Sequence, residues 1–157
     1  MVALPRSARL VLVASPGRRL VELARLAEAL DARPDSAWVS IRTPESESVL
    51  AGRSVAWLPA GPGAARCGPV VARLLTDPDL TALVGTGGAV AVPAVLAALT
   101  AGREAHFVET SDRTRGPSAA GRLVAAHPRT RLWTHHLGPG WGPRWHRDIR
   151  MDGVRAD

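Results

Sequence analysis

Short apolar runs alternate with amphipathic stretches along most of the chain. Strands are expected at residues 9–14, 37–41, 54–58, 81–84 and 104–108, with a possible sixth at 131–134. The spacing of apolar residues predicts helices at 20–30, 69–76, 89–101 and 118–126, and a short helix from Pro44 to about Gly52. Because strands that alternate with helices form a parallel sheet covered on both faces, the pattern predicts an α/β fold with a doubly wound, Rossmann-like sheet.

Three loops are expected to meet at one edge of this sheet. In the strand order 3-2-1-4-5, the first and fourth strands are neighbours, and ligands bind beyond the carboxyl ends of the strands at that point. Residues 15–19, 85–88 and 109–113 follow the first, fourth and fifth strands. These loops therefore contain most of the candidate functional residues.

Length and composition favour one globular lobe. The chain has 157 residues, of which 46% are hydrophobic and 22% are charged. These values exclude a disordered, collagen-like or coiled-coil protein, and the length excludes an enzyme with two full lobes. We expect a single Rossmann-like domain over residues 1–157, with its core at about 8–135 and a Gly-, Pro- and Trp-rich tail at about 136–157.

Two observations favour a cytoplasmic protein. The single cysteine, Cys67, cannot form an internal disulfide, and residues 1–9 contain no apolar signal-peptide core. The uncharged stretch at 80–102 is long enough to span a bilayer, but its glycines and Pro93 favour a strand, a turn and a buried helix. We therefore expect no transmembrane segment.

The positive charge is concentrated in the C-terminal third. The formal net charge is +6, and all 20 basic side chains are arginine. Residues 113–150 contain eight arginines and a single acid, Asp148. An excess of arginine over lysine is typical of G/C-rich coding sequences, so we expect no nucleic-acid partner. The charged third is expected to face either an anionic surface or solvent.

The first two loops suggest an anion site. Gly85, Thr86, Gly87 and Gly88 would let backbone N–H groups turn toward a phosphate at the start of the next helix, although the glycines would also suit the turn geometry alone. Ser15, Gly17, Arg18 and Arg19 lie where the first helix begins, a place that disfavours cations unless an anion binds there. Two solvated arginines are the alternative. The chain lacks both a G-x-G-x-x-G motif after the first strand and a P-loop lysine, which argues against NAD and P-loop nucleotide binding.

The third loop contains the catalytic candidates Glu109, Asp112 and Arg113. A general base or a carboxylate that orients a hydroxyl belongs at this edge, and a salt bridge or helix cap would explain the same residues. The histidines of the C-terminal third are not accompanied by cysteines or a carboxylate cluster, so we expect no metal. Trp133, Trp141 and Trp145 are expected to pack against the last helix or to form a partner surface.

Four segments of the chain resemble one glycosyltransferase family. They are ASPGRRLVEL at 14–23, GTGGAVAVP at 85–93, FVETSDR at 107–113 and PSAAGRLV at 117–124. In this order they are similar to the membrane-docking subunit of the two-part UDP-N-acetylglucosamine transferase of dolichol-linked glycan assembly, whose bacterial counterparts serve exopolysaccharide synthesis. The resemblance covers roughly residues 8–150, and the two middle segments are its most specific part.

The resemblance implies the acceptor-side lobe of a GT-B glycosyltransferase, similar to the N-terminal lobe of MurG. A separate partner subunit would hold the nucleotide sugar. The chain would then act in a heterodimer that transfers a sugar, N-acetylglucosamine or a related one, from a UDP-sugar to a lipid-linked acceptor, with no cofactor. A non-catalytic scaffold that recruits the donor-binding partner, and a stand-alone Rossmann domain that binds a small ligand, are the alternatives.

The chain departs from the family pattern at two places. The family usually has Ser-Gly-Gly-His-Leu in the first loop, whereas residues 16–20 read PGRRL, and Arg19 in the histidine position cannot act as a general base. Eukaryotic members have an N-terminal membrane anchor, which is not expected here. We therefore expect peripheral docking on the inner face of the cell membrane through a basic surface that contains Arg115, Arg122, Leu123, Arg129 and Arg131.

Overall fold

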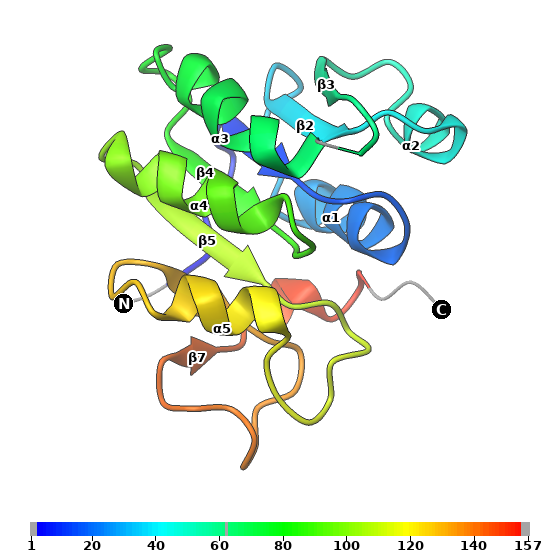
Figure 1. The fold of residues 1–157 in the computed structure, drawn as a ribbon. Coiled ribbons are helices and arrows are strands. Elements are labelled where there is room, and N and C mark those ends of the chain that lie inside the picture. Colours follow the sequence, from blue (N-terminus) through cyan, green and yellow to red (C-terminus); the bar gives the residue numbers. More distant parts are fainter. Residues whose placement is uncertain (1–2, 62, 155–157) are drawn as a thin grey trace.

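The computed structural model describes residues 3–61 and 63–154 and shows one parallel sheet between helices (Figure 1). The strands are β1 (Leu10–Val13), β2 (Ala37–Ile41), β3 (Val55–Leu58), β4 (Ala82–Gly85), β5 (Glu104–Val108), β6 (Arg131–Trp133) and β7 (Trp145–His146). The helices are α1 (Arg18–Ala29), α2 (Pro44–Val49), α3 (Gly63–Leu74), α4 (Ala91–Thr100) and α5 (Ala119–Ala125), followed by a short 3-10 helix, η1 (Ile149–Met151).

The strand order confirms the predicted Rossmann-like topology. The seven strands lie in the order β3-β2-β1-β4-β5-β6-β7, and every neighbouring pair is parallel. The interior strand β1 pairs with β2 on one side and with β4 on the other, and its last residue, Val13, lies opposite Gly85. The carboxyl ends of β1, β4 and β5 therefore lie side by side.

Side chains of β1 alternate between two apolar layers. Val11 and Val13 pack into the layer under α3 and α4, whereas Leu10 and Leu12 pack into the layer that contains the apolar face of α1. Figure 1 shows α3, α4 and α5 in a row on one face of the sheet, with α1 on the other. Because both faces are covered, β1 is apolar at every position, as is typical of a parallel sheet.

Helix α3 begins earlier than the sequence pattern predicts. Its first residue is Gly63 rather than Pro69, which lies inside the helix. Proline is favoured in the first turn of a helix, but Cys67, one turn further along α3 than Gly63, is completely buried in the core. Packing of this turn therefore outweighs the local preference of proline. Burial raises the pKa of the Cys67 thiol to about 12, so this cysteine is a core residue rather than a reactive thiol.

The C-terminal tail contributes a strand and buried side chains to the core, rather than forming only turns. Residues 145–146 form the edge strand β7, which the sequence pattern does not predict. Trp141 and Trp145 pack edge to face, with ring centroids 4.9 Å apart, and Trp145 meets Phe107 of β5 at 6.4 Å. Both tryptophans lie in the core layer that contains Val124 of α5, as the packing interpretation predicts, whereas Trp133 packs in the opposite layer, with the apolar face of α1.

The uncharged stretch at 80–102 forms β4, the glycine turn and α4, as predicted. Among the residues that the structure describes, no helix is long and apolar enough to cross a membrane.

A buried histidine makes the stability dependent on pH. His106 on β5 is completely buried, its Nδ1 accepts a hydrogen bond from Trp133 Nε1 at 3.1 Å, and its Nε2 lies 3.2 Å from Glu104 Oε1. Burial lowers its pKa to about 4, with the nearby Arg131 adding to the shift and Glu104 opposing it. Below pH 6.5 the unfolded chain takes up a proton that the folded chain does not, so stability falls as the pH drops toward 4.

We expect the free energy of unfolding to decrease by about 2 kcal/mol between pH 6.5 and 5 because of this group. Urea denaturation at both pH values measures the change. His106→Asn keeps an acceptor for Trp133 but does not titrate, so the decrease should be smaller by that amount. An equal decrease in both proteins would show that His106 is not the group responsible.

Candidate functional site

The loop after β1 brings two arginines to the start of α1. Gly17 precedes the helix with φ at +96°, and no side chain caps the first turn. Arg18 and Arg19 are the first two helical residues, and both are exposed. Arg18 Nη1 lies 3.6 Å from Glu22 Oε2, one turn further along the helix. Since the first turn of a helix already has partial positive charge, Arg19 adds a cation where an anion would be stabilised.

The loop after β4 is in direct contact with this arginine. The Thr86 hydroxyl donates a hydrogen bond of 2.7 Å to the Arg19 carbonyl oxygen, which joins the two loops. Gly87 and Gly88 have φ of +106° and +81°, and the Arg19 side chain lies directly against both. A Cβ on Gly88 would lie 2.2 Å from Ser15 Oγ, so the two loops are closely packed there. Thus Ser15, Arg19, Thr86, Gly87 and Gly88 form one contiguous surface.

Glu109 is buried at the start of α5. Its carboxylate accepts hydrogen bonds from the backbone N–H of Ser118 and from the Ser118 hydroxyl at 2.9 Å. Burial raises the pKa of Glu109, and the Ser118 hydrogen bonds and the charges of Arg113 and Arg19 oppose the increase. Because its oxygens are occupied by the residue that precedes α5, the geometry favours a capping role over contact with a ligand.

Asp112 and Arg113 differ in what they present to solvent. Asp112 is exposed, and its Oδ1 accepts a hydrogen bond of 2.5 Å from Thr110 Oγ1. This hydrogen bond lowers the pKa of Asp112, with smaller contributions from the charges of Arg18 and Arg19. The Arg113 guanidinium donates to the carbonyl oxygens of Gly116 and Pro117, at 3.3 and 2.8 Å, and so fixes the loop. Of the three catalytic candidates, Asp112 is the one placed to contact a ligand as a carboxylate.

A third carboxylate, Glu22, holds the site together. Its side chain on α1 is 3% exposed, and it accepts hydrogen bonds from the backbone N–H and the hydroxyl of Ser111, at 2.9 and 2.7 Å. His135 Nε2, after β6, lies 3.7 Å from Glu22 Oε1. His136 Nε2 lies 2.8 Å from the Ser111 carbonyl oxygen, so segments from α1, β5 and β6 meet at Ser111.

The role of Glu22 is not visible in the local sequence pattern. Ser111 is 89 residues away along the chain, and the helical spacing only places Glu22 beside the apolar Leu23. Glu22 becomes buried only when α1 packs against the loop after β5, and the local sequence does not reveal this contact.

An open groove of about 620 Å³ extends from this surface. It is lined by the first turns of α3, α4 and α5, with Arg19 and Gly88 on one side and Leu123 on another. Most of the remaining lining is apolar: Ala64, Ala65, Ala89, Val92, Pro93, Ala119 and Ala120. The groove therefore combines an exposed guanidinium with an apolar wall, next to the N-terminal ends of α3 and α4.

The residues expected to dock on a membrane are spread along α5 and both of its flanking loops. Arg115 is exposed in the loop before the helix, and Arg122 and Leu123 are exposed on the helix itself. Arg129 and Arg131 lie beyond its C-terminal end, where Arg129 donates to the Leu99 carbonyl oxygen and Arg131 pairs with Glu104.

Within the described residues, no group of three or more histidine, cysteine or acidic side chains is arranged to hold a metal ion. The site is therefore built from arginine, carboxylate, hydroxyl and backbone groups.

No protein-family model matches the chain, and no curated protein matches it significantly. Among solved structures, Acinetobacter baumannii MurG superposes with a TM-score of 0.65 at 15% identity, over 86% of this chain and 43% of the MurG chain.

Two short-chain dehydrogenase structures also match. They are a putative enzyme from Escherichia coli CFT073 complexed with NADPH and a mutant enzyme from Serratia marcescens, with TM-scores of 0.44 and 0.45 and identities of 13% and 18%. They cover 83% and 84% of this chain and 78% and 75% of their own chains. At such identities a likeness establishes the fold alone, and the TM-scores of the two dehydrogenases are too low to carry an argument. The chain is therefore a Rossmann-like α/β lobe with the fold of part of MurG, and it spans less than half of the MurG chain.

Proposed function

We propose that this chain is the acceptor-side subunit of a two-part glycosyltransferase that uses a lipid-linked acceptor. The observation that carries the proposal is Arg19, an exposed cation that lies against Gly87 and Gly88 at a mostly apolar groove. The diphosphate of the acceptor would bind the Arg19 guanidinium and the N-terminal ends of α3 and α4. The fold shared with part of MurG is consistent with this function.

The apolar wall supports an amphiphilic ligand over a fully polar one. Val92 and Pro93 of α4 and Leu123 of α5 line the groove, and the Leu123 side chain is 63% exposed. A sugar phosphate would gain little from these side chains, whereas a prenyl chain would bury them together with its own apolar surface. The ligand class that fits both parts of the groove is a prenyl diphosphate.

Asp112 would orient the reacting hydroxyl of the acceptor. The charges of Arg18 and Arg19 lower the pKa of its exposed carboxylate, which supports a role for Asp112 near the expected diphosphate. Glu109 would support the reaction indirectly, by fixing the start of α5 through Ser118.

A partner subunit would supply the other half of the active site. The likeness to MurG covers 43% of the MurG chain, and this chain would need a second lobe to enclose a UDP-sugar. We propose N-acetylglucosamine or a related sugar as the transferred group, as the family resemblance implies. Docking on an anionic membrane would involve Arg122 and Leu123, the exposed cation and apolar side chain on α5.

Binding of farnesyl diphosphate, a short soluble prenyl diphosphate, tests the groove directly. We expect Arg19→Gln to weaken its binding about tenfold, because one charge-assisted contact to the diphosphate is lost. Arg73→Gln is the matched control, since Arg73 is an exposed arginine near the opposite end of α3. Isothermal titration calorimetry measures both variants.

Two further ligands test the diphosphate and the prenyl parts of the proposal separately. Farnesol lacks the diphosphate and inorganic pyrophosphate lacks the prenyl chain, so both are expected to bind the groove more weakly than farnesyl diphosphate. Equal binding of farnesyl diphosphate to the wild type and Arg19→Gln would contradict the assignment of Arg19.

A further inference from the structure

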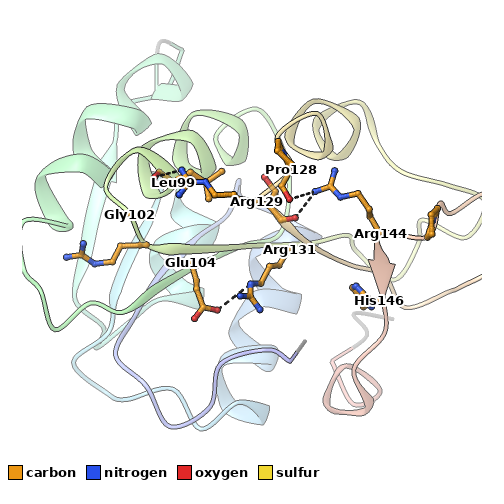
Figure 2. A pocket seen from close by; sticks show the side chains of 11 residues that line it. Leu99, Gly102, Glu104, Pro128, Arg129, Arg131, Arg144 and His146 are labelled. Atoms are coloured by element: carbon orange, nitrogen blue, oxygen red, sulfur yellow. Dashed lines mark hydrogen bonds and ion pairs between the residues drawn. The ribbon is translucent and has the colours of Figure 1, made fainter. Parts of the chain in front are cut away.

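A second cavity lies at the opposite, amino-terminal ends of the strands (Figure 2). Its volume is about 590 Å³, and it is bordered by the segments that lead into β5, β6 and β7. The charged and ionisable side chains that line it are Arg103, Glu104, Arg129, Arg131, Arg144 and His146. Because this cavity is at the other edge of the sheet, it is separate from the groove that contains Arg19.

Backbone carbonyl groups hold two of these arginines in place. Arg129 Nη2 donates to the Leu99 carbonyl oxygen at 2.9 Å. Arg144 Nη2 donates to the Thr130 carbonyl oxygen at 2.9 Å, and its guanidinium also donates to the carbonyl oxygens of Ala125, His127 and Pro128. Figure 2 shows the bond from Arg129 to Leu99 and the bonds from Arg144 to other lining residues, together with the pair of Arg131 and Glu104. Peptide carbonyls carry no net charge, so these contacts orient the guanidinium groups without neutralising them.

Little negative charge faces the cavity. Of the described residues, Glu104 is the single carboxylate that lines it, and the distance from its Oε1 to Arg131 Nε is 3.6 Å. The Glu104 and Arg131 side chains are 54% and 40% exposed, so water and salt weaken this pair. Arg103 donates to the carbonyl oxygens of Leu75 and Leu80, away from the other arginines. Arg129, Arg131 and Arg144 therefore provide an excess of positive charge.

Capping of helix ends accounts for part of this arrangement. Arg129 and Arg144 bond to carbonyl groups at or just beyond the C-terminal ends of α4 and α5, which favour cations. Arg131 has no such role, because among the described residues its ion pair is with Glu104 and it bonds to no backbone carbonyl. Capping therefore accounts for two of the three arginines but not for the third.

We propose that this cavity binds the phosphate group of an anionic ligand. Guanidinium groups suit phosphate because each combines a permanent positive charge with several N–H donors, and groups already fixed in place lose little entropy on binding. A cavity volume of about 590 Å³ also lies within the range of small-molecule sites. The phosphate can belong to a soluble metabolite or to a lipid headgroup, and the experiment distinguishes the two.

NMR titration of the isotope-labelled chain with inorganic pyrophosphate tests the soluble source. We expect shift changes at residues 102–104, 128–131 and 143–146, which can be separated from any changes at residues 85–89 of the groove. The variant Arg129→Gln/Arg131→Gln should weaken binding at the cavity about tenfold, as expected for lost charge-assisted contacts. The matched control Arg66→Gln/Arg73→Gln removes the same charge from exposed residues of α3 outside the cavity and should leave this binding within about twofold of the wild type.

Co-sedimentation with phosphatidylcholine vesicles, with and without phosphatidylglycerol, tests the lipid source. If the cavity takes a lipid headgroup, Arg129→Gln/Arg131→Gln should weaken binding to the anionic vesicles, whereas Arg66→Gln/Arg73→Gln should retain most of it. The proposal is overturned if pyrophosphate causes no shifts at the cavity and both double variants bind vesicles equally. It is equally overturned if both double variants weaken pyrophosphate binding to the same extent, because net charge alone would then explain the result.

Discussion

Gly88→Ala is expected to lower the free energy of unfolding by about 4 kcal/mol, because two costs add at this position. The φ of +81° disfavours any residue with a Cβ. The new Cβ would also lie 2.2 Å from Ser15 Oγ and 2.8 Å from Ser15 Cβ, so the loop after β1 would have to move. Urea denaturation measures the loss.

Two controls separate strain from close packing. Gly102→Ala also has a positive φ, of +74°, but no atom lies within 4 Å of the new Cβ, so only about 1–2 kcal/mol should be lost. The double variant Ser15→Gly/Gly88→Ala removes the clash, and it should be at least about 1 kcal/mol more stable than the sum of the single effects predicts. Equal losses in Gly88→Ala and Gly102→Ala would show that Ser15 and Gly88 are not in close contact.

Glu22→Ala is expected to cost about 3–5 kcal/mol of stability. The substitution removes the acceptor of both Ser111 hydrogen bonds and the negative charge next to His135 and Arg18. Since Glu22 is 2% exposed, water does not replace these interactions without opening the structure. Chemical denaturation measures the change.

Glu47→Ala is the matched control for this prediction. Glu47 also pairs with an arginine, Arg42, but the two side chains are 48% and 58% exposed, so the loss should be below about 1 kcal/mol. Glu22→Gln keeps one oxygen acceptor for Ser111, so its loss of stability should lie between those of Glu22→Ala and Glu47→Ala. A cost for Glu22→Ala as small as that of Glu47→Ala would contradict the proposed role of Glu22 in holding the site.

Most of the sheet could be predicted because local pattern and tertiary environment agree. The residues of β1 are β-branched or leucine and are followed by Pro16 and Gly17, so the strand and its end are both visible in the sequence. The short strand β7 has no such signal. Its two residues lie in a segment rich in glycine and proline, and Trp145 is positioned by packing on Phe107 and Trp141. Contacts of this kind depend on the completed core.

The candidate site, like the sheet, could be predicted only in part from the sequence. Ser15, Arg19 and Gly88 could be placed together because the carboxyl ends of neighbouring parallel strands meet at one edge. The capping of α5 by Glu109 and the burial of Glu22 depend on which side chains the loops turn inward, and neither has a short-range pattern. The catalytic prediction for Asp112 rests on its exposure and charge.

The interior position of β1 in the sheet has a consequence for how the chain folds. β1 precedes the other strands of the sheet along the chain, yet one of its two edges is completed by β4, whose residue Ala82 pairs with Leu10. A nascent chain that ends after β3 would therefore expose a bare, wholly apolar strand edge, which is prone to pair with other chains. Closing the loop between β1 and β4 is entropically costly before the contacts form, so we expect the pairing of these two strands to limit the folding rate.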